Sequence, residues 1–229
     1  MKSCIETIHS GFEIVFCFAT EQSAIYLTDI RLCGVSNFSH KITVASPIAL
    51  TRLSCLTTSP EILCVVKKPK ANCNNLDEEK PLLILDAIRD PGNMGTIIRT
   101  ADWFGFPQIL CSEDCVEYTN PKAIQASMGS FTRTKIVYTD ISEYLKMQSH
   151  RNIYGLSMTG ESIQKQSFKF NDIIIIGSES HGISAVTASY INKSIAISMF
   201  RHGASAPESL NAAIAAGIFM YAYRESVNY

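Results

Sequence analysis

The sequence has little net charge, no long hydrophobic run and no recognisable leader segment. A formal net charge of −1 over 229 residues argues against a whole-molecule electrostatic field for nucleic acid, so a basic contact surface would have to be local. No apolar run approaches the ~20 residues that a membrane-spanning helix needs, and the start has no signal-peptide core. We therefore expect a cytoplasmic protein without membrane contact. The basic residues available for a local patch are Lys67, Lys68, Lys70, Arg133, Lys135, Lys165 and Lys169.

Cysteine is plentiful but follows no ligand or disulfide pattern. The chain has eight cysteines, and several, such as Cys17 and Cys64, lie inside apolar runs, unlike the framework of a small secreted protein. Cys111 and Cys115, in CSEDC, have no second pair and no histidine at ligand spacing. We expect reduced thiols and no metal site.

Residues 1–70 alternate short helix and strand patterns and end at a polar segment. Helix patterns cover 4–12 and 45–53, and strand patterns cover 13–19, 42–45 and 61–69, the last ended by Pro69. The segment ANCNNLDEEK, residues 71–80, has no hydrophobic periodicity and reads as a linker. The sequence therefore predicts a small α/β domain over 1–70, a linker over 71–80 and a second domain over 81–229.

The second domain repeats a strand-helix rhythm that predicts a mainly parallel sheet. Its strand patterns are continuous apolar runs, as in strands buried on both faces. They cover 82–88, 108–111, 134–138, 152–158, 172–177 and 194–199. Helix patterns cover 94–105, 120–131, 141–147 and 208–225.

The last helix pattern is apolar on almost every side. We expect its buried stripe to consist of Leu210, Ile214, either Gly217 or Ile218, and Tyr221. Phe219, Met220 and Tyr223 would then be left over, either for self-association or for packing under the first domain.

Three loops follow strands of this sheet, where ligands gather in open α/β proteins. In the first, DPGNMGTIIR, Asn93 is a candidate helix cap and Arg99 shares a helix face with Thr96 and Trp103. In the second, Gly177 and Gly182 flank Glu179, a carboxylate suited to hydroxyl or cationic partners rather than to phosphate.

The third loop precedes the last helix. Ser205 to Glu208 could form a capping box, and Ser209 and Asn211 would then lie in the first turn. A hydrolase with Ser209 as nucleophile and His202 as base is an alternative, but the chain has no GxSxG elbow and no clear third triad member.

Together the loops resemble the motifs of the SpoU (TrmH-type) branch of the knotted RNA methyltransferases, in the SPOUT superfamily. The first loop matches through Asp90, Pro91, Asn93, Gly95, Ile97, Arg99, Thr100, Ala101, Phe104 and Gly105. The second matches through Gly177, Glu179 and Gly182, and the third through Ser209, Leu210, Asn211, Ala215 and Ile218. The segment NPKAIQASMGSF resembles a fourth motif, and order and spacing agree over 82–226.

The resemblance implies a C-terminal domain with a trefoil knot and an N-terminal module that resembles a ribosomal RNA-binding protein. It also implies transfer of a methyl group from S-adenosylmethionine to a ribose 2′-hydroxyl of RNA, by a homodimer. Ribosomal RNA is favoured over tRNA, because this kind of N-terminal module is commoner among enzymes that modify rRNA.

The resemblance also implies the roles of individual residues. The matching catalytic set is Asn93, Arg99, Glu179, Ser209 and Asn211. The matching cofactor-binding set is Gly177, Glu179, Gly182, Ile197, Met199, Leu210 and Asn211. The loop over 200–207 is longer than is usual in the family. That departure keeps a second hypothesis open, a non-catalytic RNA-binding or ribosome-assembly protein with the same fold.

Overall fold

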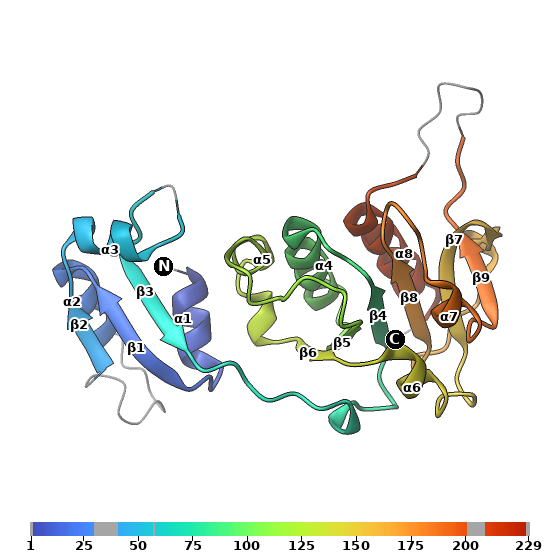
Figure 1. Cartoon of the computed structure of the whole chain (residues 1–229), viewed down its shortest axis with the longest axis horizontal. Helices are drawn as coiled ribbons and strands as arrows, with labels where there is room; N and C mark the ends of the chain where they lie inside the picture. Colours follow the sequence, from blue (N-terminus) through green and yellow to red (C-terminus); the bar gives the residue numbers. More distant parts are fainter. Residues whose placement is uncertain (1, 30–40, 57, 201–208, 228–229) are drawn as a thin grey trace. The chain divides into compact units, whose positions relative to one another are not determined.

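The computed structural model describes residues 2–29, 41–56, 58–200 and 209–227. The chain forms two compact units, Met1–Lys70 and Ala71–Tyr229 (Figure 1). None of the helices in the described ranges is long and apolar enough to cross a membrane.

The first unit is a three-stranded sheet with helices. Its elements are α1 (Lys2–His9), β1 (Ile14–Ala19), α2 (Glu21–Asp29), β2 (Ile42–Val44), α3 (Pro47–Leu53) and β3 (Ile62–Val66). The strand order is β2-β1-β3, with β1 parallel to β2 and antiparallel to β3. One face of the sheet packs on α1 and α2, through Ile8, Ile14, Cys17, Ala19, Ala24, Leu27 and Ile62.

The second unit contains a six-stranded sheet. Its strands are β4 (Leu82–Asp86), β5 (Gln108–Cys111), β6 (Lys135–Tyr138), β7 (Ile153–Ser162), β8 (Ile173–Gly177) and β9 (Lys193–Ala196). They are ordered β6-β5-β4-β8-β7-β9, and every pairing is parallel. The predicted α/β class with a mainly parallel sheet is confirmed.

Helices cover the sheet, because both faces of its central strands are buried. They are α4 (Pro91–Trp103), α5 (Pro121–Ser127), α6 (Ile141–Leu145), α7 (Ala185–Ala188) and α8 (Ala212–Ser226), with 3-10 turns η2 (Cys73–Asn75), η3 (Ser130–Thr132) and η4 (Ile163–Lys165). Leu82 and Ile84 pack with α6 in one core cluster, and the alternate residues Leu83 and Leu85 are just as inaccessible. In Figure 1, α4 and α8 lie beside one another, and their residues are in contact.

A close contact between α4 and α5 depends on a glycine in α4. A Cβ atom at Gly95 would lie 2.4 Å from the carbonyl oxygen of Ala123 in α5, which is shorter than any real contact. The backbone of α4 therefore approaches α5 in a way that no side chain would permit.

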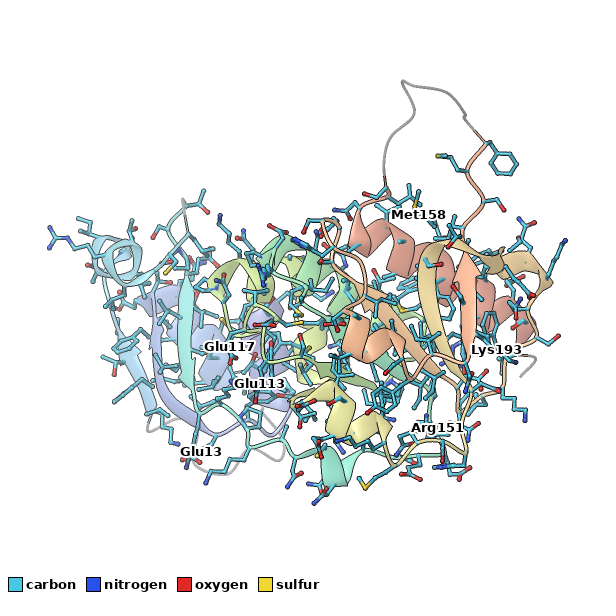
Figure 2. All side chains as sticks on the ribbon, turned by 45° about the vertical axis from the view of Figure 1, so that its right-hand side comes forward. Glu13, Glu113, Glu117, Arg151, Met158 and Lys193 are labelled. Carbon is cyan, nitrogen blue, oxygen red and sulfur yellow. The ribbon has the colours of Figure 1, made fainter. Side chains whose placement is uncertain are left out.

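The polar segment 71–80 packs onto the second unit. The Asp77 amide donates to Gln108 Oε1, and Gln108 Nε2 donates back to the Asp77 carbonyl. Arg151, labelled in Figure 2 and 3 % exposed, donates from Nη2 to the carbonyl of Lys80. These contacts hold the segment against the end of the sheet at which β4 and β5 begin.

The buried stripe expected for the last helix is wrong. The side chains that pack inward are Ala212, Ala213, Ala216, Phe219, Met220 and Tyr223. Leu210, Ile214, Ile218 and Tyr221 are 45, 54, 38 and 55 % exposed. The cause is that α8 is apolar on nearly all sides, so periodicity alone could not select the face that meets the sheet.

The expected start of that helix is also wrong. The helix begins at Ala212, and Asn211 is its N-cap. Ser205 and Glu208, the predicted capping box, lie outside the described residues.

Candidate active site

The first two loops leave adjacent strands at a switch in strand order. β4 pairs with β8, and Asp86 lies opposite Gly177 in the register. From this pair the sheet continues through β5 and β6 on one side and through β7 and β9 on the other. A parallel sheet opens a crevice at such a point, beyond the carboxyl ends of its strands.

The first loop is held by Asp90 rather than by Asn93. Asp90 is the N-cap of α4, and its Oδ1 accepts the Asn93 amide at 2.7 Å. The predicted capping role of Asn93 is therefore wrong. Pro91 and Gly92 fill the first helical positions, so Asn93 lies inside the first turn and its side-chain amide is available for other contacts.

The second loop doubles back on the end of its own strand. Ser178 and Gly182 exchange both backbone hydrogen bonds, at 3.0 and 2.9 Å. A Cβ atom at Gly177 would lie 2.1 Å from the Gly182 carbonyl carbon, and Gly182 has a φ of +66°. Both glycines are thus needed for a tight turn that presents Glu179 at its tip.

The three loops meet at Glu179. Its Oε1 accepts hydrogen bonds from Asn93 Nδ2 and from the Ala212 amide, the latter at 3.2 Å. Asn211 Nδ2 lies 2.9 Å from Asn93 Oδ1 and 3.5 Å from Glu179 Oε1. A carboxylate here is also favoured by the dipole of α8, whose N-terminus it faces. Three residues that are far apart in the sequence therefore form one hydrogen-bonded cluster.

The side-chain amide of Asn211 caps α8 through its oxygen and contacts the cluster through its nitrogen. Its Oδ1 accepts the Ala213 and Ile214 amides at 3.0 and 3.2 Å, and its Nδ2 makes the contacts with the cluster. Aspartate would cap the helix equally well but has no donor for Asn93.

Sequence reasoning missed Asp86, which anchors the far end of the second loop. Asp86 is 5 % exposed, and its Oδ2 accepts the Ser184 amide at 2.9 Å. Ala87 follows with a φ of +57°, which only a few per cent of non-glycine residues adopt. The available signal was a carboxylate at the end of the apolar run LLILD.

The structure does not bring Arg99 into the cluster. Arg99 is exposed, as are Thr96 and Trp103 on the same face of α4. No hydrogen bond or ion pair between described residues joins it to Asn93, Glu179 or Asn211. Six residues turn an α-helix by about 600°, which leaves Arg99 roughly 120° around α4 from Asn93.

The other predicted residues flank the undescribed stretch 201–208. Ile197 and Met199 follow β9. Ile197 is half-buried, and the Met199 side chain is 43 % exposed. Ser209 and Leu210 precede α8 and are both exposed. His202, the base in the hydrolase alternative, lies outside the described residues.

Comparison with known proteins identifies this arrangement. The model of the SpoU rRNA Methylase family matches residues 80–221, which include all three loops and both strands of the switch point. The chain belongs to the SpoU rRNA methylase family. The expected family membership is confirmed.

Relatives in this family are RNA methyltransferases by name. An uncharacterized tRNA/rRNA methyltransferase of Synechocystis is 33 % identical over 146 residues, 62 % of this chain and 52 % of the relative. A 23S rRNA (guanosine(2553)-2′-O)-methyltransferase of Bacillus subtilis is 28 % identical over 175 residues, 73 % of this chain and 66 % of the relative. The chain thus spans between about half and two thirds of the length of these two relatives.

Solved structures extend the similarity to almost the whole chain. A putative RNA methyltransferase of the TrmH family from Porphyromonas gingivalis aligns with a TM-score of 0.82 at 27 % identity, over 98 % of this chain and 87 % of that one. An S-adenosylmethionine-bound rRNA methyltransferase from Sinorhizobium meliloti aligns with a TM-score of 0.81 at 20 % identity, over 100 and 86 % of the two chains. At that identity the second likeness speaks to the fold alone.

Proposed function

We propose that this chain transfers the methyl group of S-adenosylmethionine to a ribose 2′-hydroxyl of RNA, with rRNA favoured over tRNA. The observation that carries the proposal is the Asn93–Glu179–Asn211 cluster at the carboxyl ends of β4 and β8. Membership of the SpoU family and the names of the B. subtilis and other rRNA-modifying relatives support the choice of reaction and of RNA.

The residues present fit the cofactor. Met199 and Leu210 expose 43 and 45 % of their surface, Leu210 directly before Asn211 in the sequence, and Ile197 is half-buried. Exposed apolar side chains of this kind would be covered by the flat, apolar faces of an adenine base. Backbone groups of the turn between Gly177 and Gly182 would hold the polar part of the molecule, because neither glycine has a side chain to block them.

The chain's own residues have two tasks in this reaction. S-adenosylmethionine supplies an electrophilic methyl group, so the protein must chiefly align the attacking oxygen with it. Glu179 and Asn93, locked by their mutual hydrogen bond, suit the orientation of hydroxyl groups. The 2′-hydroxyl must also lose its proton, for which a guanidinium is a poor base. We assign Arg99 the role of holding the neighbouring phosphate and stabilising the developing alkoxide.

Arg99 would perform that role in the site of a second copy. Its exposed face on α4 continues into the exposed face of α8, since Gly217 lies against Thr100 and the Phe104 and Tyr221 rings are 6.4 Å apart. Trp103, Ile214 and Ile218 extend this surface with 84, 54 and 38 % of their area exposed. Arg99 does not reach the Glu179 cluster of its own chain, and exposed apolar side chains surround it. Both features support a homodimer in which Arg99 of one copy completes the site of the other.

Two further features are proposed from the family and from the likeness in fold. The C-terminal unit would carry the trefoil knot of the family, formed around its last strands and α8. The N-terminal unit would bind the RNA substrate, and residues 71–80 would connect the two. A cytoplasmic location and the absence of a metal stay predictions from the sequence.

The test combines calorimetry with methyl transfer. We expect micromolar binding of S-adenosylmethionine and S-adenosylhomocysteine to the full chain. We also expect tritium transfer from the methyl donor to rRNA, recovered as 2′-O-methylnucleotides after nuclease digestion. Binding without transfer to any rRNA or tRNA would contradict the proposed reaction. RNA binding without affinity for either nucleoside would favour the non-catalytic hypothesis.

A further inference from the structure

In the described part of the N-terminal unit, one face of the sheet exposes aromatic and apolar side chains. Phe16 and Phe18 lie two residues apart on β1, so both point away from the face that carries Cys17 and Ala19. Phe16 is 55 % exposed, although phenylalanine normally buries most of its surface. Its ring and that of Phe18 are stacked, with centroids 6.2 Å apart and planes inclined by 26°.

Neighbouring strands widen this aromatic surface. Val65 lies opposite Phe16 in the antiparallel register and is 42 % exposed, and Leu63 lies opposite Phe18. On the other side Thr43 pairs with Phe18 and is also exposed. We name these five residues the open face.

Basic side chains gather at the end of the open face where β1 begins. Lys67 follows β3 on the same side as Leu63 and Val65, by strand alternation, and its amide continues the ladder by donating to the Glu13 carbonyl. The Lys41 ammonium reaches the Ile14 carbonyl from the start of β2. Lys68 and Lys70, both exposed, follow in sequence.

An acidic residue also lies at this end, and its ion pair is weak. Glu13, labelled in Figure 2, lies 3.1 Å from Lys67, and both side chains are more than 60 % exposed. Exposed pairs of this kind are screened by salt and exchange partners readily. A phosphate could therefore take the place of Glu13.

We propose that the open face is a platform on which unpaired RNA bases stack, with Lys41, Lys67 and Lys68 holding the adjoining phosphates. This inference rests on the proposed action on RNA and adds the surface and the form of RNA that it binds. Stacked aromatic rings on a sheet take bases of single strands and loops, whereas bases in a duplex are already stacked on each other. Positive charge beside the rings fits a polyanion better than it fits an apolar protein segment.

The first test is fluorescence anisotropy of the full chain with a fluorescein-labelled 12-nucleotide single-stranded RNA of mixed sequence. Because aromatic-base stacking is typically worth 1–3 kcal/mol per base, Phe16→Ala should weaken binding about 5- to 150-fold. Phe16→Leu, which keeps the apolar area but has no ring, should weaken it as well, and Phe16→Trp should preserve it. Ile25→Ala, at a 64 % exposed position on α2, is the matched control and should bind as the wild type does.

The same titrations separate stacking from electrostatic binding. The labelled strand annealed to its complement should bind more weakly than the single strand and should not respond to Phe16→Leu. Lys67→Gln should lower the slope of log affinity against log salt by about one unit. Wild-type affinity of Phe16→Leu for the single strand, or preference of the wild type for the duplex, would overturn the proposal.

Two controls keep this inference distinct from the proposed reaction. Calorimetry with S-adenosylmethionine should be unaffected by Phe16→Leu, because the open face lies in the other unit from the Glu179 cluster. If methyl transfer fails while single-stranded RNA binding depends on the Phe16 ring, the platform stands and the reaction is wrong. If light scattering instead shows that Phe16→Ala dissociates an oligomer, the open face is an interface between copies and the platform is refuted.

Discussion

Removing the carboxylate of Glu179 should weaken cofactor binding more than it weakens the fold. Glu179 Oε1 accepts hydrogen bonds from Asn93 Nδ2 and from the Ala212 amide, and Asn211 Nδ2 lies within 3.5 Å. Glu179→Ala removes the one atom on which all three loops converge. The loops would still be present, but their arrangement would no longer be fixed before the cofactor arrives.

The size of the effect follows from those contacts. A hydrogen bond to a charged group contributes about 1.5–3 kcal/mol, and a carboxylate at a helix N-terminus adds about 0.3–1 kcal/mol. Because Glu179 is exposed, the lower end applies, and we expect a loss of about 2 kcal/mol for Glu179→Ala. That loss corresponds to roughly 30-fold weaker binding of S-adenosylmethionine. Glu179→Gln keeps an acceptor oxygen but no charge, so about 1 kcal/mol, or roughly fivefold, is expected.

Titration calorimetry with S-adenosylmethionine measures this effect, and thermal unfolding checks the fold. The unfolding temperature should fall by no more than a few degrees, since the cluster lies outside the core. Glu143→Gln is the control, because Glu143 is an exposed glutamate on α6 that pairs with Lys146. Binding to Glu179→Ala within twofold of the wild type would refute the reasoning, as would an equal loss in the Glu143 variant.

Other perturbations test the remaining contacts. Arg99→Lys keeps the charge but not the planar fork, so methyl transfer should fall about 100-fold while S-adenosylmethionine binding is unchanged; an unchanged rate would contradict the assigned role. Ile218→Asp should convert a dimer to monomers in light scattering and abolish transfer; a surviving dimer would exclude this surface. Burial raises the pKa of the Asp172 carboxyl above the ordinary value of an aspartate. The folded state therefore binds that proton more tightly, and this stability is lost as the pH rises through the folded pKa. In urea unfolding, the wild type should lose stability relative to Asp172→Asn as the pH rises from the ordinary aspartate range through the raised pKa of Asp172; a constant difference would contradict the shift.

The strands of the large sheet could be predicted because burial on both faces leaves a direct mark in the sequence. Leu82 to Leu85 and Ile173 to Ile176 are almost wholly inaccessible, and both stretches are unbroken apolar runs. Parallel pairing and the position of the loops follow from the helices between such runs. The sequence therefore predicted that Asn93 and Glu179 lie at the carboxyl ends of the strands.

The orientation of α8 could not be predicted in the same way. Phe219 and Tyr223 pack inward because their rings meet Phe106 and Phe168, residues supplied by two other segments. Nothing in the helix distinguishes them from Ile218 or Tyr221, which are equally apolar in sequence. The face was decided by partners that are distant in the chain, and periodicity carries no information about those partners.

The sequence showed which residues could cap the helices, but not which of them is the N-cap. Asn93 and Asp90 are both good capping residues three positions apart, and the choice between them depends on which one lies before the first helical turn. The same uncertainty concealed Asn211 as the cap of α8. Asp86 was hidden for a different reason, because its partner, the Ser184 amide, is 98 residues away.

The double use of Asn211 links the start of α8 to the assembly of the site. Its Oδ1 satisfies two amides that would otherwise lack partners at the helix N-terminus, and its Nδ2 is thereby aimed at Asn93 Oδ1. The Ala212 amide, another donor of the same helix end, goes to Glu179. Asn211 and Glu179 thus accept three of the amides that an α-helix leaves unpaired at its N-terminus, so the first turn of α8 and the cluster share the same hydrogen bonds. This coupling explains how a site drawn from three distant loops can be exposed to solvent and still have one defined geometry.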